Sequence, residues 1–435
     1  MAQITGGPRS PVGVLPPPRR HPRPRALMPL ALRNPGYRRV WAGIAFLFFA
    51  RWMEVAAFSW LAVERTHDPF AIAMVGFARI TPFFLLGPLG GFVADRFNRR
   101  QIQIAARLGL AGISAVAALL LWLDALELWH IYALGILSGV IMSLEVPARR
   151  AFTIDVVGNH AVTSGVAFDQ LAVMSTLLIG PNVAGLLLPV LPGAVIFAII
   201  VVLNALSAAV LPRAPQRRVA TVAREAIFSS LRSGVNVVRR NRALAGALIA
   251  VGITNMFGFA FFPLIPYFAK DVLNTGSAGL GLLISAEAAG GVIAVLLIAL
   301  VGNHFRHHGR AIIGFAAACH LTGFGLAFAP SLIGTFGLLA LAGGFAAALS
   351  MMQANLLMIV TPPQARGRLV GVEMVFGGAY PLGSLLVGGL AGVMTPFNAI
   401  VMLSAIGLAL MVAVALAMPA LRARTPAAPS TAGAA

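Results

Sequence analysis

A few ionisable residues lie inside long apolar runs of this chain, in which only 10% of the residues are charged. Arg51 and Glu54 stand three positions apart, which places them on one face of a helix, and Arg79 lies inside the next apolar run. A charge at the centre of a lipid bilayer costs roughly 3 kcal/mol, so such residues pair with one another or face a cavity. We therefore expect these three residues to form a cavity-facing charge cluster. A static ion pair that holds two helices in register is the alternative of equal weight.

Glu287 differs from this cluster, because the stretch "LLISAEAAGGVIAV" places no cation close to it in sequence. Burial of a lone carboxyl group disfavours its charged form, so Glu287 can hold a proton and release it when a cavity opens to one side. The alternative is a neutral Glu that is hydrogen-bonded to a neighbouring helix. Asp169 and Glu373 lie nearer the ends of their apolar runs, where water and arginines neutralise them. We rank both lower as proton carriers.

Membrane-spanning helices must position these residues. Hydrophobic residues make up 59% of the 435-residue chain and the mean hydropathy is +0.89, which is more apolar surface than one water-soluble core can bury. Apolar runs of about 20 residues, each long enough to cross a bilayer as a helix, recur along the chain. The predicted spans are residues 40–63, 72–94, 101–123, 129–147, 164–189, 193–211, 243–267, 278–301, 310–329, 332–358, 368–393 and 397–418.

Arginine is concentrated in every second loop. Arg96, Arg99 and Arg100 follow the second span, and Arg149 and Arg150 follow the fourth. Because cytoplasmic loops hold Lys and Arg, we expect a multi-pass protein of the cytoplasmic (inner) membrane with both termini in the cytoplasm. The net charge of +19 then reflects this topology and an attraction to anionic lipid of the bilayer. We expect no nucleic-acid partner, since the arginines are scattered over short loops.

A long basic segment after the sixth span divides the chain into two sets of six spans. We predict a disordered basic tail at 1–36, six-helix bundles at 37–212 and 243–419, a cytoplasmic linker at 213–242 and a C-terminal tail at 420–435. The first tail is not a signal peptide, because the apolar run after it is long enough to stay in the bilayer. Faint similarity between "GPNVAGLLLP" and "GSLLVGGLAG" supports a duplicated, all-α membrane fold. Such halves open a central cavity to either side in turn.

The stretch "GPLGGFVADRFNRR" carries a dense group of charges after the second span. Gly87, Gly91 and Asp95 are four apart, so two small residues on one helical face permit close helix approach. Asp95 stands near a helix C-terminus, where an anion needs a compensating partner. We interpret the stretch as a gate contact that is made and broken, with retention of the loop in the cytoplasm as the alternative. The residues of this candidate gate motif are Gly91, Asp95, Arg96, Arg99 and Arg100.

This stretch resembles the signature between spans 2 and 3 of the major facilitator superfamily. The segments "EVPARRAFTIDVV", "IGPNVAGLL" and "RGRLVGVEMVFGGAYPLGSLLVGGLAG" are similar to a drug-efflux and siderophore-export branch of that superfamily. The resemblance covers nearly everything after residue 33 and implies a 12-helix fold. It also implies that Asp95 holds a closed cytoplasmic gate against span 11. Gly180, Pro181 and Gly185 partly match the antiporter glycine–proline motif of span 5; a simple helix kink is the alternative.

The resemblance further implies a cavity lined by spans 1, 4, 7 and 10, with contributions from spans 2, 5, 8 and 11. Span 7 reads "NMFGFAFFPLIPYF" and span 10 supplies "LSMMQANLLM", so aromatic rings and Met side chains can accept varied apolar substrates. The polar residues that we expect to orient a ligand there are Asn255, Tyr267, Gln353 and Asn355. The fourth span holds no Arg before Glu145, unlike that of many drug–proton antiporters, so proton coupling by that route is not supported.

Catalysis finds little support in the sequence. Cys319 is the only cysteine, and no Walker A loop or H-E-x-x-H motif is present, so we predict no catalytic residue, metal or cofactor. The prediction is a monomeric secondary transporter that exports amphipathic, drug-like small molecules by alternating access in exchange for protons. A siderophore or metabolite exporter, an importer and a non-transporting receptor are the alternatives, and a membrane enzyme is the rival class.

Overall fold

The computed structural model describes residues 29–213, 227–301, 307–329, 331–361 and 366–423. Within these ranges all regular structure is helical, and eleven helices are long and apolar enough to cross a membrane. One further apolar helix, α6, is shorter, with 17 residues. The described helices therefore agree with the expected all-α membrane fold.

The first six helices are joined by short turns. Their bounds are α1 Pro35–Arg65, α2 Pro69–Arg96, α3 Arg99–Trp122, α4 Leu128–Val157, α5 Val162–Leu187 and α6 Gly193–Ala209. Asn34, Asp68 and Asn98 start α1, α2 and α3, because each side chain accepts hydrogen bonds from free backbone N–H groups of the first turn. The predicted end of the fourth span at 147 is wrong. Helix α4 continues through Pro147 to Val157 and stops at Gly158, whose φ is +71°.

The second set of helices is more broken than the sequence predicts. Its seventh span consists of α8 Arg242–Ile253, the π-helical η4 Thr254–Gly258, the 3-10 turn η5 Phe262–Leu264, α9 Ile265–Tyr267 and the π-helical η6 Phe268–Val272. Pro263 and Pro266 cannot donate backbone hydrogen bonds, which explains why the helix is interrupted there. The other helices are α7 Ile227–Arg240, α10 Gly276–Val301, α11 His308–Leu326, α12 Leu332–Val360, α13 Arg366–Gly377, α14 Ala379–Val393, α15 Pro396–Ala417 and α16 Pro419–Arg422.

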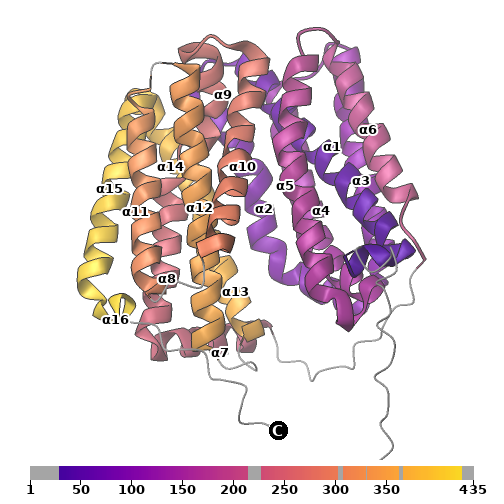
Figure 1. Ribbon diagram of the computed structural model, residues 1–435. Helices are drawn as coiled ribbons and strands as arrows, with labels where there is room; N and C mark the ends of the chain where they lie inside the picture. The colour runs from indigo at the N-terminus through magenta and orange to yellow at the C-terminus, as the bar shows by residue number, and fades with distance from the viewer. Residues whose placement is uncertain (1–28, 214–226, 302–306, 330, 362–365, 424–435) are drawn as a thin grey trace, which may run out of the picture.

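The helices form two side-by-side groups, α1–α6 and α8–α16, with matching internal neighbours (Figure 1). In the first group α2 packs on α4, α3 on α6 and α1 on α5. In the second group α10 packs on α12, α11 on α15 and α14 on η4. The two groups meet where α5 contacts α10 and where α2 contacts α14. This repeated pattern gives the two pseudo-symmetric bundles of the major facilitator fold.

Helix α7 lies at the lower end in Figure 1, close to α16 and beneath α13. We call this the basic end, because the turn before α3 and the last part of α4 place Arg99, Arg100, Arg149 and Arg150 there. The sequence predicts only a linker in this region, so the helical form of α7 is a finding. Its Val238 packs with Leu244 and Leu369 at the base of the second bundle.

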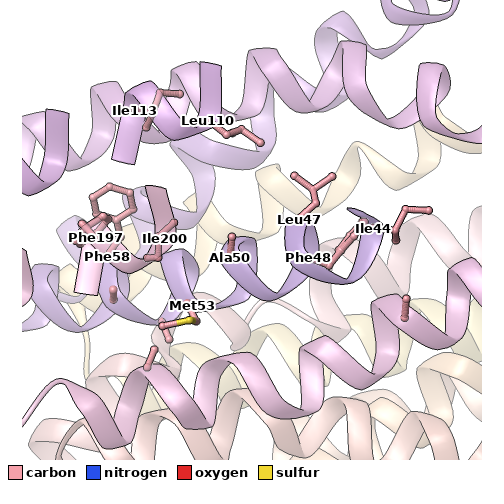
Figure 2. Packing of buried hydrophobic residues seen from close by; sticks show 14 of the residues in the cluster. Ile44, Leu47, Phe48, Ala50, Met53, Phe58, Leu110, Ile113, Phe197 and Ile200 are labelled. Carbon is pink, nitrogen blue, oxygen red and sulfur yellow. The ribbon is translucent and has the colours of Figure 1, made fainter. Parts of the chain in front are cut away.

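Helix α1 forms the centre of the first bundle and is covered on several sides. Figure 2 shows its Ile44, Leu47, Phe48 and Met53 among apolar side chains of α3 and α6. The ring of Phe58 lies 4.7 Å from that of Phe197, centroid to centroid. Large apolar side chains elsewhere stay exposed on the outer surface, as helices that face lipid require. Examples are Leu300, Ile333, Val393 and Trp122.

Glycines bring neighbouring helices into backbone contact. A side chain at Gly139 of α4 would meet the main-chain carbonyl of Arg79 on α2, and one at Gly343 of α12 would meet that of Glu287 on α10. Helices in lipid associate through such close packing of small residues. The two contacts join corresponding helix pairs, α2 with α4 in the first bundle and α10 with α12 in the second.

Candidate central binding site

A cavity of about 490 Å³ lies between the two bundles. All eight spans that the sequence assigns to the cavity contribute to its wall. The aromatic and apolar part comes mostly from the broken seventh span, through Phe259, Phe262, Pro263, Ile265 and Pro266. The polar and charged lining residues are Arg51, Trp52, Ser59, Arg79, Asn255, Glu287, Ser350 and Tyr380.

Arg79 and Glu54 form a buried ion pair next to this cavity. The Nη1 of Arg79 lies 2.9 Å from Oε1 of Glu54, and the Ser138 hydroxyl donates to the same oxygen at 3.0 Å. Glu54 is 1% exposed, so the pair is shielded from solvent. The predicted cluster of three residues is therefore only partly correct, because Arg51 takes another partner.

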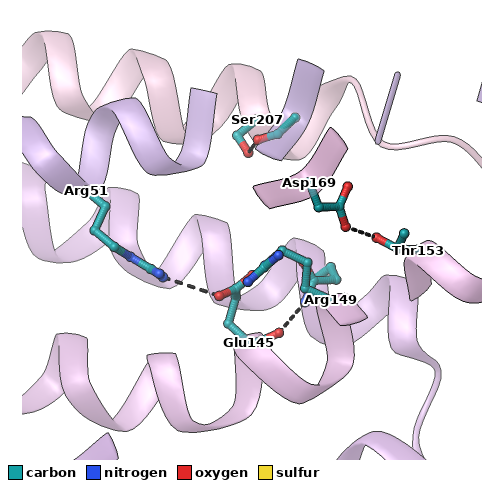
Figure 3. Close-up of polar contacts among 8 residues, drawn as sticks. Arg51, Glu145, Arg149, Thr153, Asp169 and Ser207 are labelled. Atoms are coloured by element: carbon teal, nitrogen blue, oxygen red, sulfur yellow. Dashed lines mark hydrogen bonds and ion pairs between the residues drawn. The ribbon is translucent and has the colours of Figure 1, made fainter. Parts of the chain in front are cut away.

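Arg51 instead pairs with Glu145 of α4 (Figure 3). Its Nη2 lies 3.3 Å from Oε2 of Glu145, while Nε of Arg149 lies 3.1 Å from Oε1. Both guanidinium groups also lie over the ring of Phe48, at 4.6 and 4.9 Å from its centroid. Glu145 is thus the shared partner of two buried arginines.

The sequence reasoning missed this second ion-pair cluster. In sequence Glu145 marks only the end of the Arg-free stretch of the fourth span, and no role is predicted for Arg107, which is 1% exposed in the middle of α3. Gln103 joins them by donating to the main-chain carbonyl of Glu145 at 2.8 Å. A usable signal was present, since Arg107 and Gln103 stand four apart inside an apolar run.

Glu287 lines the second-bundle wall of the cavity from the middle of α10. It is half-buried, and within the described residues it has neither a hydrogen bond nor an ion pair. The alternative of a Glu bonded to a neighbouring helix therefore has no support in this geometry. The carboxyl group thus lines the cavity without a protein partner among the described residues.

Asp169 and Glu373 have partners that the sequence did not indicate. Asp169 is buried and accepts from the Tyr37 hydroxyl at 2.9 Å and from the Thr153 hydroxyl at 2.7 Å (Figure 3). Water has little access to this buried carboxyl group, and two hydroxyl groups bond to it instead, while Arg149 lies close enough to act on it electrostatically. Glu373 accepts from the amide of Gln353 at 3.2 Å.

The candidate gate motif has a defined arrangement on the arginine side, whereas the side chain of Asp95 lies outside the described part of the structure. Arg99 binds both carboxylate oxygens of Asp155 at 2.9 Å, which ties the start of α3 to the end of α4. Arg100 donates to the carbonyl of Pro212 at 3.0 Å. Arg96 is exposed and lies 4.6 Å over the ring of Phe92.

Of the two glycines expected at a close helix contact, Gly87 makes one and Gly91 does not. No atom lies within 4 Å of a side chain built on Gly91, so Gly91 makes no close helix contact. Its neighbour Gly90 packs against the main-chain carbonyl of Ser143 on α4 instead, and a Cβ built on Gly87 would lie 3.0 Å from Cε of Met374. The predicted close approach thus occurs at Gly87, and the second contact lies at Gly90, one residue before the predicted Gly91.

The glycine–proline residues of α5 pack this helix between α1 and α10. A Cβ built on Gly180 would lie 2.9 Å from Cβ of Trp52, and one built on Gly185 would meet the main-chain carbonyl of Ser277. The carbonyl of Pro181 faces Gly281, and α5 continues through this proline to Leu187. These residues thus set the contact between the two bundles.

Of the four polar residues expected in the cavity, only Asn255 lines it. Gln353 is buried against Glu373, Tyr267 packs beside the second-bundle core, and Asn355 is exposed outside the lining. The sequence also predicts that methionines of span 10 line the cavity, but Met352 packs in a core cluster of the second bundle. Met142 of α4 lines the cavity.

Two matched groups of apolar helices around a central cavity define a membrane transporter of the major facilitator fold. A family model described as transmembrane secretion effector matches residues 26–431. The chain belongs to this family of the major facilitator superfamily. It is 29% identical over 395 residues to the enterobactin exporter EntS of Escherichia coli, covering 83% of this chain and 87% of EntS.

A second relative is the macrolide efflux protein A of Streptococcus pyogenes, 26% identical over 273 residues. That match covers 61% of this chain and 66% of the relative, just under two thirds of its length. Among solved structures, a bacterial homologue of the human lysosomal transporter Spinster, inward-facing and unoccupied, has a TM-score of 0.64 at 15% identity, covering 89% of this chain and 96% of that one. A POT family transporter in complex with 5-aminolevulinic acid has a TM-score of 0.70 at 11% identity, with 90% and 97% covered.

Proposed function

We propose that this protein exports amphipathic small molecules across the cytoplasmic membrane by alternating access, in exchange for protons. The observation that carries the proposal is the central cavity, which both bundles line and which holds the unpaired Glu287 in its wall. The names of the two relatives, an enterobactin exporter and a macrolide efflux protein, support export as the direction. A siderophore or another metabolite is the second candidate substrate, because EntS matches the larger share of the chain.

The basic end faces the cytoplasm in this proposal. Arg99, Arg100, Arg149 and Arg150 lie at this end, and positive loop residues are retained on the cytoplasmic side. Both termini are then cytoplasmic, and the protein works as a monomer in the bilayer. The proposed units remain two bundles at 37–212 and 243–419, with the segment 213–242 between them.

Alternating access requires contacts between the bundles that can open at each end. At the end opposite α7, Lys270 donates to the carbonyl of Val63 at 2.6 Å, and His67 lies 3.1 Å from Asp271. At the basic end, Phe84 of α2 lies against Gly377. We assign the first set of contacts to an outer gate and the second to an inner gate, to which Asp95 contributes.

Proton exchange is assigned to Glu287. A carboxyl group in a cavity that opens to alternate sides can take up a proton from outside and release it inside. Glu54 and Asp169 are poorer candidates, because each is already held by two buried partners. Glu373, bonded to Gln353, also ranks below Glu287.

The experiment is transport by the purified protein in proteoliposomes that contain a pH-sensitive dye. Lipophilic cations, neutral drugs and siderophores are supplied in turn under an imposed proton gradient. Proton movement opposite to that of a substrate supports the proposal. Substrate movement without proton movement leaves export but removes exchange, and movement of no compound contradicts export.

A further inference from the structure

We propose that the cavity binds its substrate through an anionic oxygen, at a site formed by the side-chain N–H groups of Arg79 and Trp52. This inference rests on the proposed export function and adds the chemical class of the substrate. Both residues line the cavity from the first bundle. The Nη2 of Arg79 and Nε1 of Trp52 are buried, and neither has a hydrogen-bond partner within the described residues.

Both donors are held in place by their surroundings. Nη1 of Arg79 is bound to Glu54, which Ser138 fixes from α4, so the guanidinium plane is oriented and Nη2 is left over. Gly180 of α5 packs against Trp52 so closely that a Cβ built on this glycine would lie 2.9 Å from Cβ of Trp52, which restricts the indole. A buried N–H group without an acceptor is unfavourable, so an acceptor that enters the cavity recovers the lost interaction.

The charge around these donors favours an anion over a cation or a neutral group. The charged residues that line the cavity are Arg51, Arg79 and Glu287, and the buried charged neighbours of the two arginines include Arg107, Arg149, Glu54 and Glu145. The two lining arginines share the wall with a single acid, Glu287, and Nε and Nη1 of Arg107 have no partner within the described residues. Uncompensated positive charge in a low-dielectric region attracts an anionic group.

The rest of the cavity determines the body of the substrate. Phe259, Phe262 and Ile284 form an apolar wall opposite the donors, which suits an aromatic or alicyclic ring system. The structure thus assigns a rigid apolar body that carries a carboxylate or an ionised phenol. Export of such an anion is also favoured by a membrane potential that is negative inside.

The test compares three fluorescent probes that share one apolar body, namely 1-pyrenebutyrate, 1-pyrenebutanol and 1-pyrenebutylamine. Binding to the full chain in nanodiscs is followed by fluorescence titration, and transport of the same probes is followed in proteoliposomes. We expect the carboxylate to bind at least tenfold more tightly than the alcohol and the amine. Trp52→Phe, which keeps the ring but removes the N–H, is expected to lower carboxylate affinity about fivefold and to leave alcohol affinity unchanged.

Trp60→Phe is the matched control, because Trp60 also lies on α1 but donates to the exposed Glu64 at 2.7 Å. Arg79→Gln is the second variant and is expected to remove the preference for the carboxylate. Equal binding of the three probes, or an unchanged preference for the carboxylate in Trp52→Phe, overturns the anionic site. Transport of any of the probes still preserves the export proposal in that case. Binding of the carboxylate without transport supports the site and counts against export.

Discussion

Arg79 of α2 and Glu287 of α10 lie on corresponding helices of the two bundles and line one cavity. A glycine of the neighbouring helix packs against the main-chain carbonyl of each residue: Gly139 against that of Arg79, and Gly343 against that of Glu287. Arg79 has an ion-pair partner, Glu54, whereas Glu287 has none within the described residues. The pseudo-symmetric frame thus holds a fixed positive charge on one wall and a titratable group on the other.

Glu287→Gln is expected to abolish proton-driven efflux while substrate binding is kept. The amide has a similar size but cannot exchange a proton, so only the coupled step is lost. Efflux under a proton gradient and equilibrium binding are measured on the same preparation. Glu64→Gln, an exposed carboxyl at the end of α1, serves as the control. Full pH-driven transport by the Glu287 variant would remove this residue from the mechanism.

Glu145→Gln is expected to destabilise the first bundle by roughly 3–5 kcal/mol, because the change leaves buried arginines without their shared carboxylate. The Gln amide keeps one acceptor oxygen, so one of the two bonds, 3.3 Å to Arg51 and 3.1 Å to Arg149, is lost together with the negative charge. The effect is measured by thermal unfolding in detergent, with the loss of the monodisperse peak as the readout. An unchanged unfolding temperature would show that the cluster contributes little to stability.

Gly139→Ala is expected to weaken both stability and transport. The added methyl group meets the carbonyl of Arg79, so α2 and α4 must move apart at a cost of about 1–3 kcal/mol. Gly112→Ala is the matched control, since no atom lies within 4 Å of a side chain built there. Equal behaviour of the two variants in unfolding and transport assays would contradict the close packing.

Asp95→Asn is expected to weaken the inner gate. A cysteine introduced at Ser350 in the cavity wall then becomes more reactive toward a membrane-impermeant reagent applied from the cytoplasmic side. The native Cys319 is 0% exposed, so its background labelling is low. Labelling that does not differ between the variant and the unchanged Asp95 background would count against a gate role.

A reporter fused after residue 435 is expected to be active only in the cytoplasm. The arginines at the basic end are the reason, since they resist translocation. A fusion in the loop between α5 and α6 gives the opposite control. Activity of the terminal fusion only outside the cytoplasm would reverse the topology and the assignment of the two gates.

The positions of the spans could be predicted from the sequence because lipid requires long apolar runs, and each run predicted here contains an apolar helix. The interruptions in the seventh span and the continuation of α4 past Pro147 could not. A proline lowers the stability of a helix, but neighbouring helices decide whether the helix continues.

The ion pairs of the site show a second limit. Arg51 is three residues from Glu54 yet binds Glu145, which is 94 residues away. Sequence spacing reports which residues share a helical face, while the partner depends on which helices meet. For Glu287 the sequence and the structure agree, because it has no cation nearby in sequence and no partner among the described residues. The exposure of Asn355 was missed because a single polar residue does not indicate which way its helix faces.

Substrate-dependent proton flux in proteoliposomes tests the central claim most directly. The purified protein is reconstituted with an internal pH dye, and a substrate gradient is applied without a pH gradient. The account predicts proton movement opposite to that of the substrate, which disappears in Glu287→Gln while substrate binding persists. Substrate movement with no proton flux, or an unchanged flux in the variant, would contradict proton exchange at Glu287.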